Sequence, residues 1–196
     1  FLAGGAGWLG AALSLDGADD RVECGSFDVG GSALTMAAWI WADDLENCSS
    51  NDCRIVSKAT GTAEADHWFM LSTISSGAPT RLRFRLKAGG TTSTLIADSG
   101  DLVESQWLHA AAVYDGAAMT LYLDGQPIGS LAKSGALDGD PAVPVWVGGN
   151  PSDPGGKPWD GRIDDVRIYS RALSATEVGA LPPPSAQRIF SDGFES

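Results

Sequence analysis

The fold is decided by residues 161–181, which read GRIDDVRIYSRALSATEVGAL. The stretch opens as a strand, because Ile163, Val166 and Ile168 are strong strand formers, yet two adjacent aspartates, Asp164 and Asp165, lie at its start. Neighbouring side chains of a strand point to opposite faces, so one carboxylate is expected on the buried face. If Val166 and Ile168 point inward, that residue is Asp164. A cation, a basic partner or backbone donors must then offset its charge.

The rest of the chain alternates between short strands and turns. Strands are predicted over residues 11–17, 21–26, 32–42, 54–59, 67–74, 81–88, 92–98, 106–116, 119–125, 143–149 and 161–170. Asp-Gly pairs at 115–116 and 124–125 separate alternating strands, which is a strong hairpin signal. One helix is expected, after the capping box of Ser174 and Glu177. The pattern predicts an all-β fold, a two-sheet antiparallel β-sandwich (jelly roll) with one short C-terminal helix.

A change of composition marks the end of the domain. After Leu181 the chain reads PPPSAQRIFSDGFES, and proline cannot continue a helix or a central strand. We therefore expect an N-terminal extension over residues 1–10, one domain over residues 11–181 and a Pro-led tail over residues 182–196. The ending RIFSDGFES resembles those of some secreted bacterial proteins. Its apolar residues predict that the tail adds to a sheet edge, its own or a neighbour's, and so supports self-association.

Charge and cysteine content restrict the partners and the compartment. The net charge of −12 argues against nucleic acid and anionic membrane as partners, and no apolar run is long enough to span a bilayer. The chain starts without Met and without a basic leader, which indicates a mature product or a piece of a longer protein. Cys48 and Cys53 flank a polar loop and predict a short disulfide in an oxidising compartment, with Cys24 left over. Three unpaired thiols are the alternative.

The order of five segments resembles the laminin-G-like, concanavalin A-like jelly-roll family. These segments are GAGWLGAALSLDGADDRVE, LTMAAWIWA, QWLHAAAVYDGAAMTLYLDGQPIG, VWVGG and WDGRIDDVRIYSRALSATEVGAL. The resemblance implies two antiparallel sheets packed face to face, with the first and last strands as neighbours. It also implies a secreted or cell-surface module for adhesion or carbohydrate binding, often with one bound calcium. Trp39 and Trp107 fall at positions that look like core in the family.

The resemblance also suggests an offset for the charge of Asp164. It places Asp16, at the end of the first strand, close to the last strand, with Asp19 and Asp20 in the following turn. Calcium takes six to eight oxygen ligands, including carboxylates and backbone carbonyls of flexible loops. The predicted calcium ligands are Asp16, Asp20, Asp164 and Asp165.

An alternative needs no metal. In it Asp164 caps loop amides, while Asp165 pairs with Arg162 or Arg167. Zinc is not expected, because the two histidines are far apart in sequence and no cysteine cluster accompanies them. His109 lies inside an apolar strand and is expected to be a satisfied residue of the sandwich.

Residues 81–87, RLRFRLK, alternate between an apolar and a basic face. The predicted ligand-binding residues on the basic face are Arg81, Arg83, Arg85 and Lys87. This row would suit an anionic polysaccharide or an acidic neighbour, because arginine binds carboxylate and sulfate through two parallel hydrogen bonds. The alternative is a solvated face balanced by cross-strand acids, or a protected edge strand.

Trp159 lies in a Gly/Pro-rich loop and is the candidate for an exposed ring that stacks on a sugar. The alternative is that this ring plugs the end of the sandwich.

Catalysis is not expected. The carboxylate pattern of the glycoside hydrolases with this fold is approached only by Glu64 and Asp66, and Phe69 stands where the second glutamate belongs. We therefore predict a non-catalytic secreted module that binds a polysaccharide or a surface protein at a cell surface or in extracellular matrix. The alternative is a structural subunit of an extracellular assembly, with terminal segments at its contacts. A glycoside hydrolase or lyase with unrecognised catalytic residues is the third hypothesis.

Overall fold

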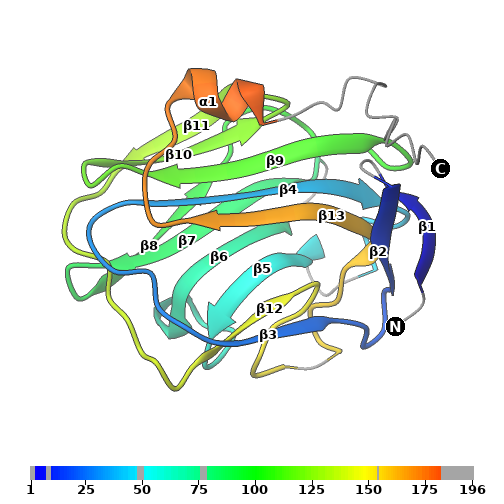
Figure 1. Ribbon diagram of the computed structural model, residues 1–196, viewed down its shortest axis with the longest axis horizontal. Helices are drawn as coiled ribbons and strands as arrows, with labels where there is room; N and C mark the ends of the chain where they lie inside the picture. The colour runs from blue at the N-terminus through cyan, green and yellow to red at the C-terminus, as the bar shows by residue number, and fades with distance from the viewer. Residues whose placement is uncertain (1–2, 8–9, 48–50, 76–78, 154, 182–196) are drawn as a thin grey trace, which may run out of the picture.

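The protein is a sandwich of two antiparallel β-sheets (Figure 1). The computed structural model describes residues 3–7, 10–47, 51–75, 79–153 and 155–181, of which 3–7 and 10–11 are described by their backbone alone. The seven-stranded sheet has the order β1 (Ala3–Gly7), β2 (Gly10–Asp16), β13 (Asp160–Tyr169), β4 (Leu34–Ala42), β9 (Trp107–Tyr114), β10 (Ala118–Leu123) and β11 (Gln126–Ala132). The six-stranded sheet has the order β3 (Val22–Ser26), β12 (Pro144–Val147), β5 (Arg54–Ala59), β6 (His67–Ile74), β7 (Arg81–Ala88) and β8 (Thr91–Ile96). The expected fold class is confirmed.

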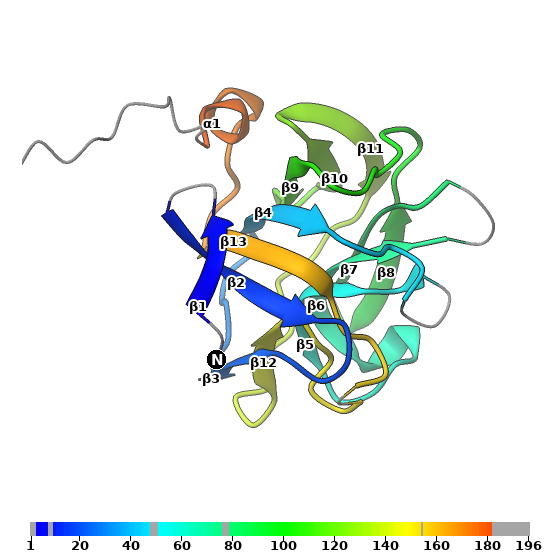
Figure 2. The same ribbon diagram turned by 90° about the vertical axis from the view of Figure 1, so that its right-hand side faces the viewer.

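The first and last parts of the domain lie side by side, as the family resemblance implies. Strand β2 pairs with β13 (Figure 2). In the register of this pair, Asp16 lies opposite Asp160. Strand β1 adds one further strand to this edge of the sheet. Neither β1 nor β11 is predicted from the sequence, because β1 is AGGAG and β11 contains Pro127 and Gly129, all poor strand residues.

A β-bulge in β13 answers the question raised by the two aspartates. The register with β4 shifts after Asp164, and Asp165 has a φ of 48°. Ile163 before the bulge is fully buried, and Val166 after it packs against the core. Asp164 lies opposite Trp39 on the outer face of the sheet. The expectation that Asp164 shares the face of Val166 was wrong, because it assumed uninterrupted alternation.

The core between the sheets consists of alternate residues from both. On β7, for example, Leu82, Phe84 and Leu86 are fully buried. The hairpin from β10 to β11 turns through Asp124 and Gly125, with φ of 50° and 77°, as a two-residue type I′ turn requires.

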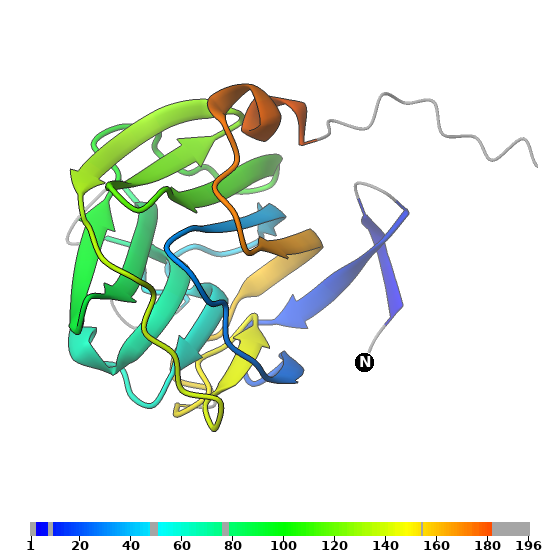
Figure 3. The same ribbon diagram turned by 60° about the vertical axis from the view of Figure 1, so that its left-hand side comes forward.

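The single α-helix of the described residues, α1 (Ala175–Ala180), lies on the outer face of the seven-stranded sheet (Figure 3). The predicted capping box is present: the Ser174 Oγ accepts from the Glu177 amide at 3.2 Å, and a Glu177 carboxylate oxygen accepts from the Ser174 amide at 2.8 Å. The buried Val178 packs with Leu173 against the sheet. With six residues, α1 is too short to cross a bilayer, and the described part of the chain has no other helix that would.

Candidate functional site

The outer face of the seven-stranded sheet carries two adjacent rows of large side chains. On β4, Ala38 and Ile40 are the sequence neighbours of Trp39 and Trp41, and both belong to the core between the sheets. The side chains of the two rows therefore point away from that core. The outer row runs from Arg162 to Trp41 to Trp107, and the inner row runs from Asp164 to Trp39 to His109. We call these six residues the tryptophan face. Trp39 and Trp107 were expected to be packed core residues. Trp39 is buried, as expected, although it packs on the outer face of the sheet, whereas Trp107 is only half-buried.

The outer row contains two half-buried indole rings. The centroids of Trp41 and Trp107 are 6.0 Å apart, with the ring planes inclined at 63°. The Arg162 guanidinium carbon lies 5.1 Å from the Trp41 centroid, within range of a cation–π interaction. The Trp41 Nε1–H donates to Asp43 Oδ1 at 2.8 Å. These contacts hold the Trp41 ring in one orientation while leaving part of it exposed.

The inner row borders a cavity of about 220 Å³. Trp39 and His109 are 7% and 5% exposed, and their ring centroids are 5.1 Å apart. The cavity is lined by Trp39, His109, Asp124, Gly125, Val178, Gly179 and Leu181. Burial lowers the pKa of the His109 imidazole, with Arg167 acting in the same direction against the opposite effect of Asp124 and Asp165. His109 is therefore neutral at pH 7.

The cavity exists because the next row of the sheet is small. There Ala37 lies opposite Ala111, and both belong to the cluster on which the helix residue Val178 packs. Alanines allow α1 to approach the sheet, whereas the bulky Trp39 keeps it away one row earlier. The helix thus forms a wall at one end of the tryptophan face.

The two aspartates of the bulge are held by partners within the chain. Asp165 forms two bonds of 2.8 Å to the Arg167 guanidinium, as the metal-free alternative proposed. Asp164 Oδ1 accepts the Asp165 amide at 2.8 Å. Both residues lie four or more positions along β13 from Asp160, the partner of Asp16.

An acidic rim lies at the open end of the tryptophan face. Ligand atoms of Asp16, Asp19 and Asp20 lie within 4.8 Å of one another. Among the predicted calcium ligands, the structure therefore brings Asp16 and Asp20 together, adds Asp19, and leaves Asp164 and Asp165 outside this group. We call Asp16, Asp19, Asp20, Asp43, Asp44 and Asp160 the acidic rim.

Charge accumulates on this rim. Burial raises the pKa of Asp160, and the carboxylates of Asp44, Asp43 and Asp16 raise it further, against a hydrogen bond of 2.9 Å from Asn47 Nδ2. The three clustered carboxylates of Asp16, Asp19 and Asp20 supply oxygen ligands of the kind that calcium takes, so the donor set fits calcium in its chemistry.

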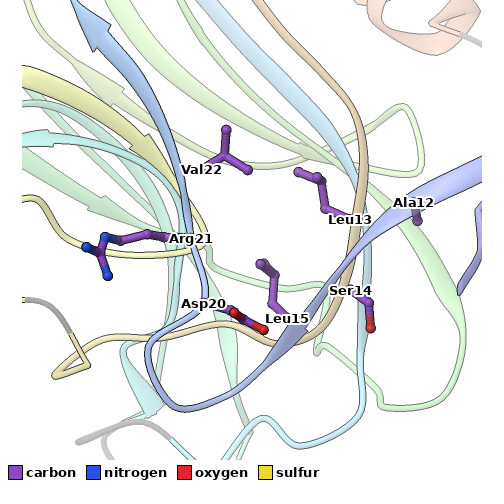
Figure 4. A pocket seen from close by; sticks show the side chains of 7 residues that line it. All are labelled: Ala12, Leu13, Ser14, Leu15, Asp20, Arg21 and Val22. Carbon is purple, nitrogen blue, oxygen red and sulfur yellow. The ribbon is translucent and has the colours of Figure 1, made fainter. Parts of the chain in front are cut away.

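A small cavity of about 50 Å³ lies beside the rim, between β2 and β3 (Figure 4). Asp20 and Leu15 border it, while the Arg21 side chain points away. Its volume suits one or two water molecules and is too small for a sugar ring.

The basic residues of β7 lie on the other sheet and are held by partners within the chain. Strand β7 lies inside its sheet, between β6 and β8, so it is not an edge strand. Arg81 Nε donates to Asp101 Oδ1 at 3.0 Å, and the Lys87 ammonium lies 5.0 Å from the Trp68 centroid. These contacts favour the balanced-face alternative over a docking row.

Arg83 belongs to a buried ion network. Its guanidinium and that of the fully buried Arg54 both donate to Asp52 Oδ1, and Lys157 Nζ lies 3.6 Å from Asp52 Oδ2. We call Asp52, Arg54, Arg83 and Lys157 the ion network. The cations lower the pKa of Asp52 although its burial acts in the opposite direction.

His67 lies between this network and Arg85. Its Nε2 is 3.5 Å from Arg54 Nη2, and its Nδ1 is 3.3 Å from Arg85 Nη1. Burial and these two cations lower the pKa of His67 to about 4.

Three further predictions from the sequence concern Trp159, the cysteines, and the pair of Glu64 and Asp66. Trp159 is 1% exposed, with its Nε1–H donating to the Trp41 carbonyl at 3.2 Å, so the expected exposed ring was wrong and the plug alternative applies. Cys48 lies outside the described residues, so the Cys48–Cys53 disulfide stays a prediction; Cys24 is exposed and unpaired. Glu64 and Asp66 form a 3₁₀ turn before β6, labelled η2 (Glu64–Asp66).

Several known proteins share this architecture. The family model described as the concanavalin A-like lectin/glucanases superfamily matches residues 16–179. Adhesion G-protein coupled receptor V1 of Danio rerio is 27% identical over 150 residues, which are 76% of this chain and only 2% of the receptor. Domain 4 of AbnA, a GH43 extracellular arabinanase from Geobacillus stearothermophilus solved with arabinotriose, matches with a TM-score of 0.66 at 20% identity, covering 89% of this chain and 78% of that one. The CBM40 of the Ruminococcus gnavus IT-sialidase gives a TM-score of 0.66 at 16% identity, with 86% and 95% covered.

Proposed function

Since the chain belongs to the concanavalin A-like lectin/glucanase superfamily, we propose that it is a non-catalytic extracellular module that binds a glycan on the tryptophan face. The observation that carries the proposal is the pair of half-buried rings, Trp41 and Trp107, held beside Arg162 and next to a cavity of ring size. An indole ring offers an apolar face to the C–H groups of a sugar, while charged and amide groups at its edge bind the hydroxyls.

The relatives fit this proposal. Domain 4 of AbnA belongs to an extracellular arabinanase and was solved with arabinotriose, and the sialidase module is a carbohydrate-binding module by name. Protein ligands are the second possibility, and the match to an adhesion receptor favours it. A glycan and a protein surface make different demands, and two half-exposed indole rings flanked by a guanidinium suit the glycan.

Nuclear magnetic resonance of the indole N–H groups tests the proposal directly. A glycan array identifies candidate ligands, and each is then titrated into ¹⁵N-labelled protein with indole signals assigned from single Trp→Phe variants. We expect the signals of Trp39, Trp41 and Trp107 to shift and those of Trp146 and Trp159 to stay. Shifts confined to Trp68 or Trp146 would place the ligand on the other sheet, and the proposal would fail.

We further propose that calcium binds at Asp16, Asp19 and Asp20 and stabilises the loop that follows β2. The proposal is supported by the order of the turn around these carboxylates, since Asp16 Oδ1 accepts the Ala18 amide at 3.0 Å and Asp20 Oδ2 accepts the Asp16 amide at 3.3 Å. Calorimetric titration with calcium after chelator treatment, followed by thermal unfolding, tests this. Binding should disappear in Asp19→Asn/Asp20→Asn and persist in Asp164→Asn. Loss of binding in Asp164→Asn as well would restore the set expected from the sequence, and binding that persists in Asp19→Asn/Asp20→Asn would contradict the proposal.

A structural role in an extracellular assembly is the second candidate for the whole chain. Its expected contact, the tail over residues 182–196, lies outside the described residues. Light scattering of the full chain tests self-association, and a clean monomer at high concentration would count against it.

A further inference from the structure

The tryptophan face is open at one end and closed at the other. At its open end the outer row reaches the ends of β4 and β13, where Asp43 and Asp160 begin the acidic rim. At its closed end stands α1, seated on the alanine row. We infer that the cavity between Trp39, His109 and α1 binds the terminal sugar unit of a neutral glycan, so that the protein recognises the end of a glycan chain. This inference rests on the proposed glycan-binding function.

The size of the cavity suits one sugar ring. Its volume is about 220 Å³. A cavity of about 150 Å³ holds benzene, so this one accommodates a single six-membered ring with its substituents. A second sugar unit therefore has to lie outside, over Trp41 and Trp107. Those rings are two residues along their strands from Trp39 and His109, a step of roughly 7 Å.

The lining selects hydroxyl groups rather than charge. It contains one aromatic plane, Trp39, one neutral imidazole, His109, and one carboxylate, Asp124, whose Oδ1 already accepts the His109 amide at 2.8 Å. The seven lining residues include no cation. The nearby Arg167 is engaged by Asp165 through both carboxylate oxygens. An anionic sugar would lack a counter-charge here and would meet the carboxylate of Asp124.

The glycines at the wall keep the cavity open. A Cβ built at Gly125 would lie 3.0 Å from the Gly179 Cα, so hairpin and helix approach each other through two residues without side chains. A Cβ built at Gly179 meets no atom within 4 Å, although Gly179 lines the cavity. A larger side chain at position 179 therefore has room to narrow the site without displacing the fold.

Chemical modification of chain ends tests the inference. The probes are arabinotriose, xylotetraose, cellotetraose, maltotetraose and, as the acidic member, α2,3-sialyllactose. Each probe that binds is compared with a form reduced to the alditol at its reducing end and with a form extended by one galactose at its other end. We expect one of the two modifications to weaken binding about tenfold or more, and the sialylated probe to bind no tighter than the neutral ones. If both modified forms bind within twofold of the parent, the protein reads the interior of chains; the inference then fails while the proposed function stands.

A matched pair of helix variants adds a second test. Gly179→Leu should weaken the same probe about tenfold, whereas Ala180→Leu, on an exposed neighbour that does not line the cavity, should leave it unchanged. Equal affinity in both variants would overturn the inference. If none of the probes binds the unmodified protein and a broad glycan array is also negative, the proposed function fails and the inference with it.

Discussion

The two outer faces of the sandwich both carry tryptophan and arginine side chains, but they use them differently. On the six-stranded sheet Arg54 and Arg83 are buried around Asp52, and Lys87 covers Trp68. On the seven-stranded sheet the rings of Trp41 and Trp107 stay half-exposed, and a cavity opens beside the inner row. The first face satisfies its polar groups within the chain, and the second leaves surface for a partner.

Composition alone therefore does not identify a ligand site. The basic row of β7 stands out in a protein of net charge −12, yet its members have acidic, aromatic or carbonyl partners nearby. A guanidinium already engaged by a buried carboxylate is a poor ligand for an external anion, since binding would have to break that pair. Where charges are internally paired, we expect large effects on stability and small effects on binding, and the reverse on the tryptophan face.

The largest effect is expected from Asp52→Asn. The change leaves the buried Arg54 and Arg83 and the half-buried Lys157 without their carboxylate, which costs about 3–5 kcal/mol in the free energy of unfolding. Chemical denaturation measures it. The control is Asp101→Asn, which removes the exposed partner of Arg81 and should cost less than about 1 kcal/mol. Equally small losses of unfolding free energy in both variants would show that the ion network does not stabilise this face.

The ion network also predicts how stability depends on pH. The pKa of His67 is lowered to about 4, whereas in the unfolded chain it lies near about 6.5. Between these values the unfolded state binds a proton that the folded state does not, so stability is complete above pH 6.5 and falls as the pH falls toward 4. The loss is on the order of 3 kcal/mol. Below that window the lowered pKa of Asp52 continues the destabilisation in the same direction.

Replacing His67 or His109 by glutamine shows which of the two outer faces controls the loss of stability at acid pH. His67→Gln should flatten the stability profile between pH 6.5 and 4, measured by denaturation at several pH values. His109→Gln on the tryptophan face is the matched variant, because burial lowers the pKa of His109 too, but without the arginines that flank His67. A profile that stays as steep after His67→Gln would mean that other groups control acid sensitivity.

Local features were predictable from the sequence, whereas long-range features were predictable only where the family resemblance supplied them. The capping box of Ser174 and Glu177 and the Asp124-Gly125 hairpin depend on residues a few positions apart, and both are present as predicted. The family resemblance supplied the pairing of the first and last strands. The bulge at Asp165 was not predicted, because side chains were assumed to alternate strictly between the two faces of the strand. The two adjacent aspartates already indicated a break in this alternation.

The sequence of β4 contains part of the signal for the tryptophan face. Trp39 and Trp41 share one side of β4, and Ala38 and Ile40 share the other, so the strand has two apolar faces and only one can meet the opposite sheet. The choice between them depends on α1, which is distant in sequence and covers only the alanine row. The partnership of Asp52 with Arg83, 31 residues apart, carries no local signal.

Two matched Trp→Ala substitutions test which of the two sheets binds the glycan. Trp41 and Trp68 are both half-buried, and each has a cation near its ring, at 5.1 Å and 5.0 Å. Trp41→Ala should weaken glycan binding about tenfold, worth about 1.4 kcal/mol, whereas Trp68→Ala should leave it unchanged. Titration calorimetry with a ligand from the array measures both, and circular dichroism checks that both variants fold. Loss of affinity only in Trp68→Ala would transfer the site to the six-stranded sheet.

The smallest effect is expected from Ser174→Ala, which removes the cap of the helix that closes the tryptophan face. The Ser174 Oγ no longer accepts the Glu177 amide, so unfolding should become easier by about 1 kcal/mol. Leu173 and Val178 remain packed on the alanine row, and the helix should therefore loosen without leaving the sheet. Hydrogen exchange of the α1 amides should accelerate, while that of β5 and β6, beneath the ion network, should not. Thr176→Ala is the control, because Thr176 is an exposed residue of the same helix and has no capping role. If exchange accelerates equally in both sheets, the helix is coupled to the whole sandwich, and the two outer faces are not independent.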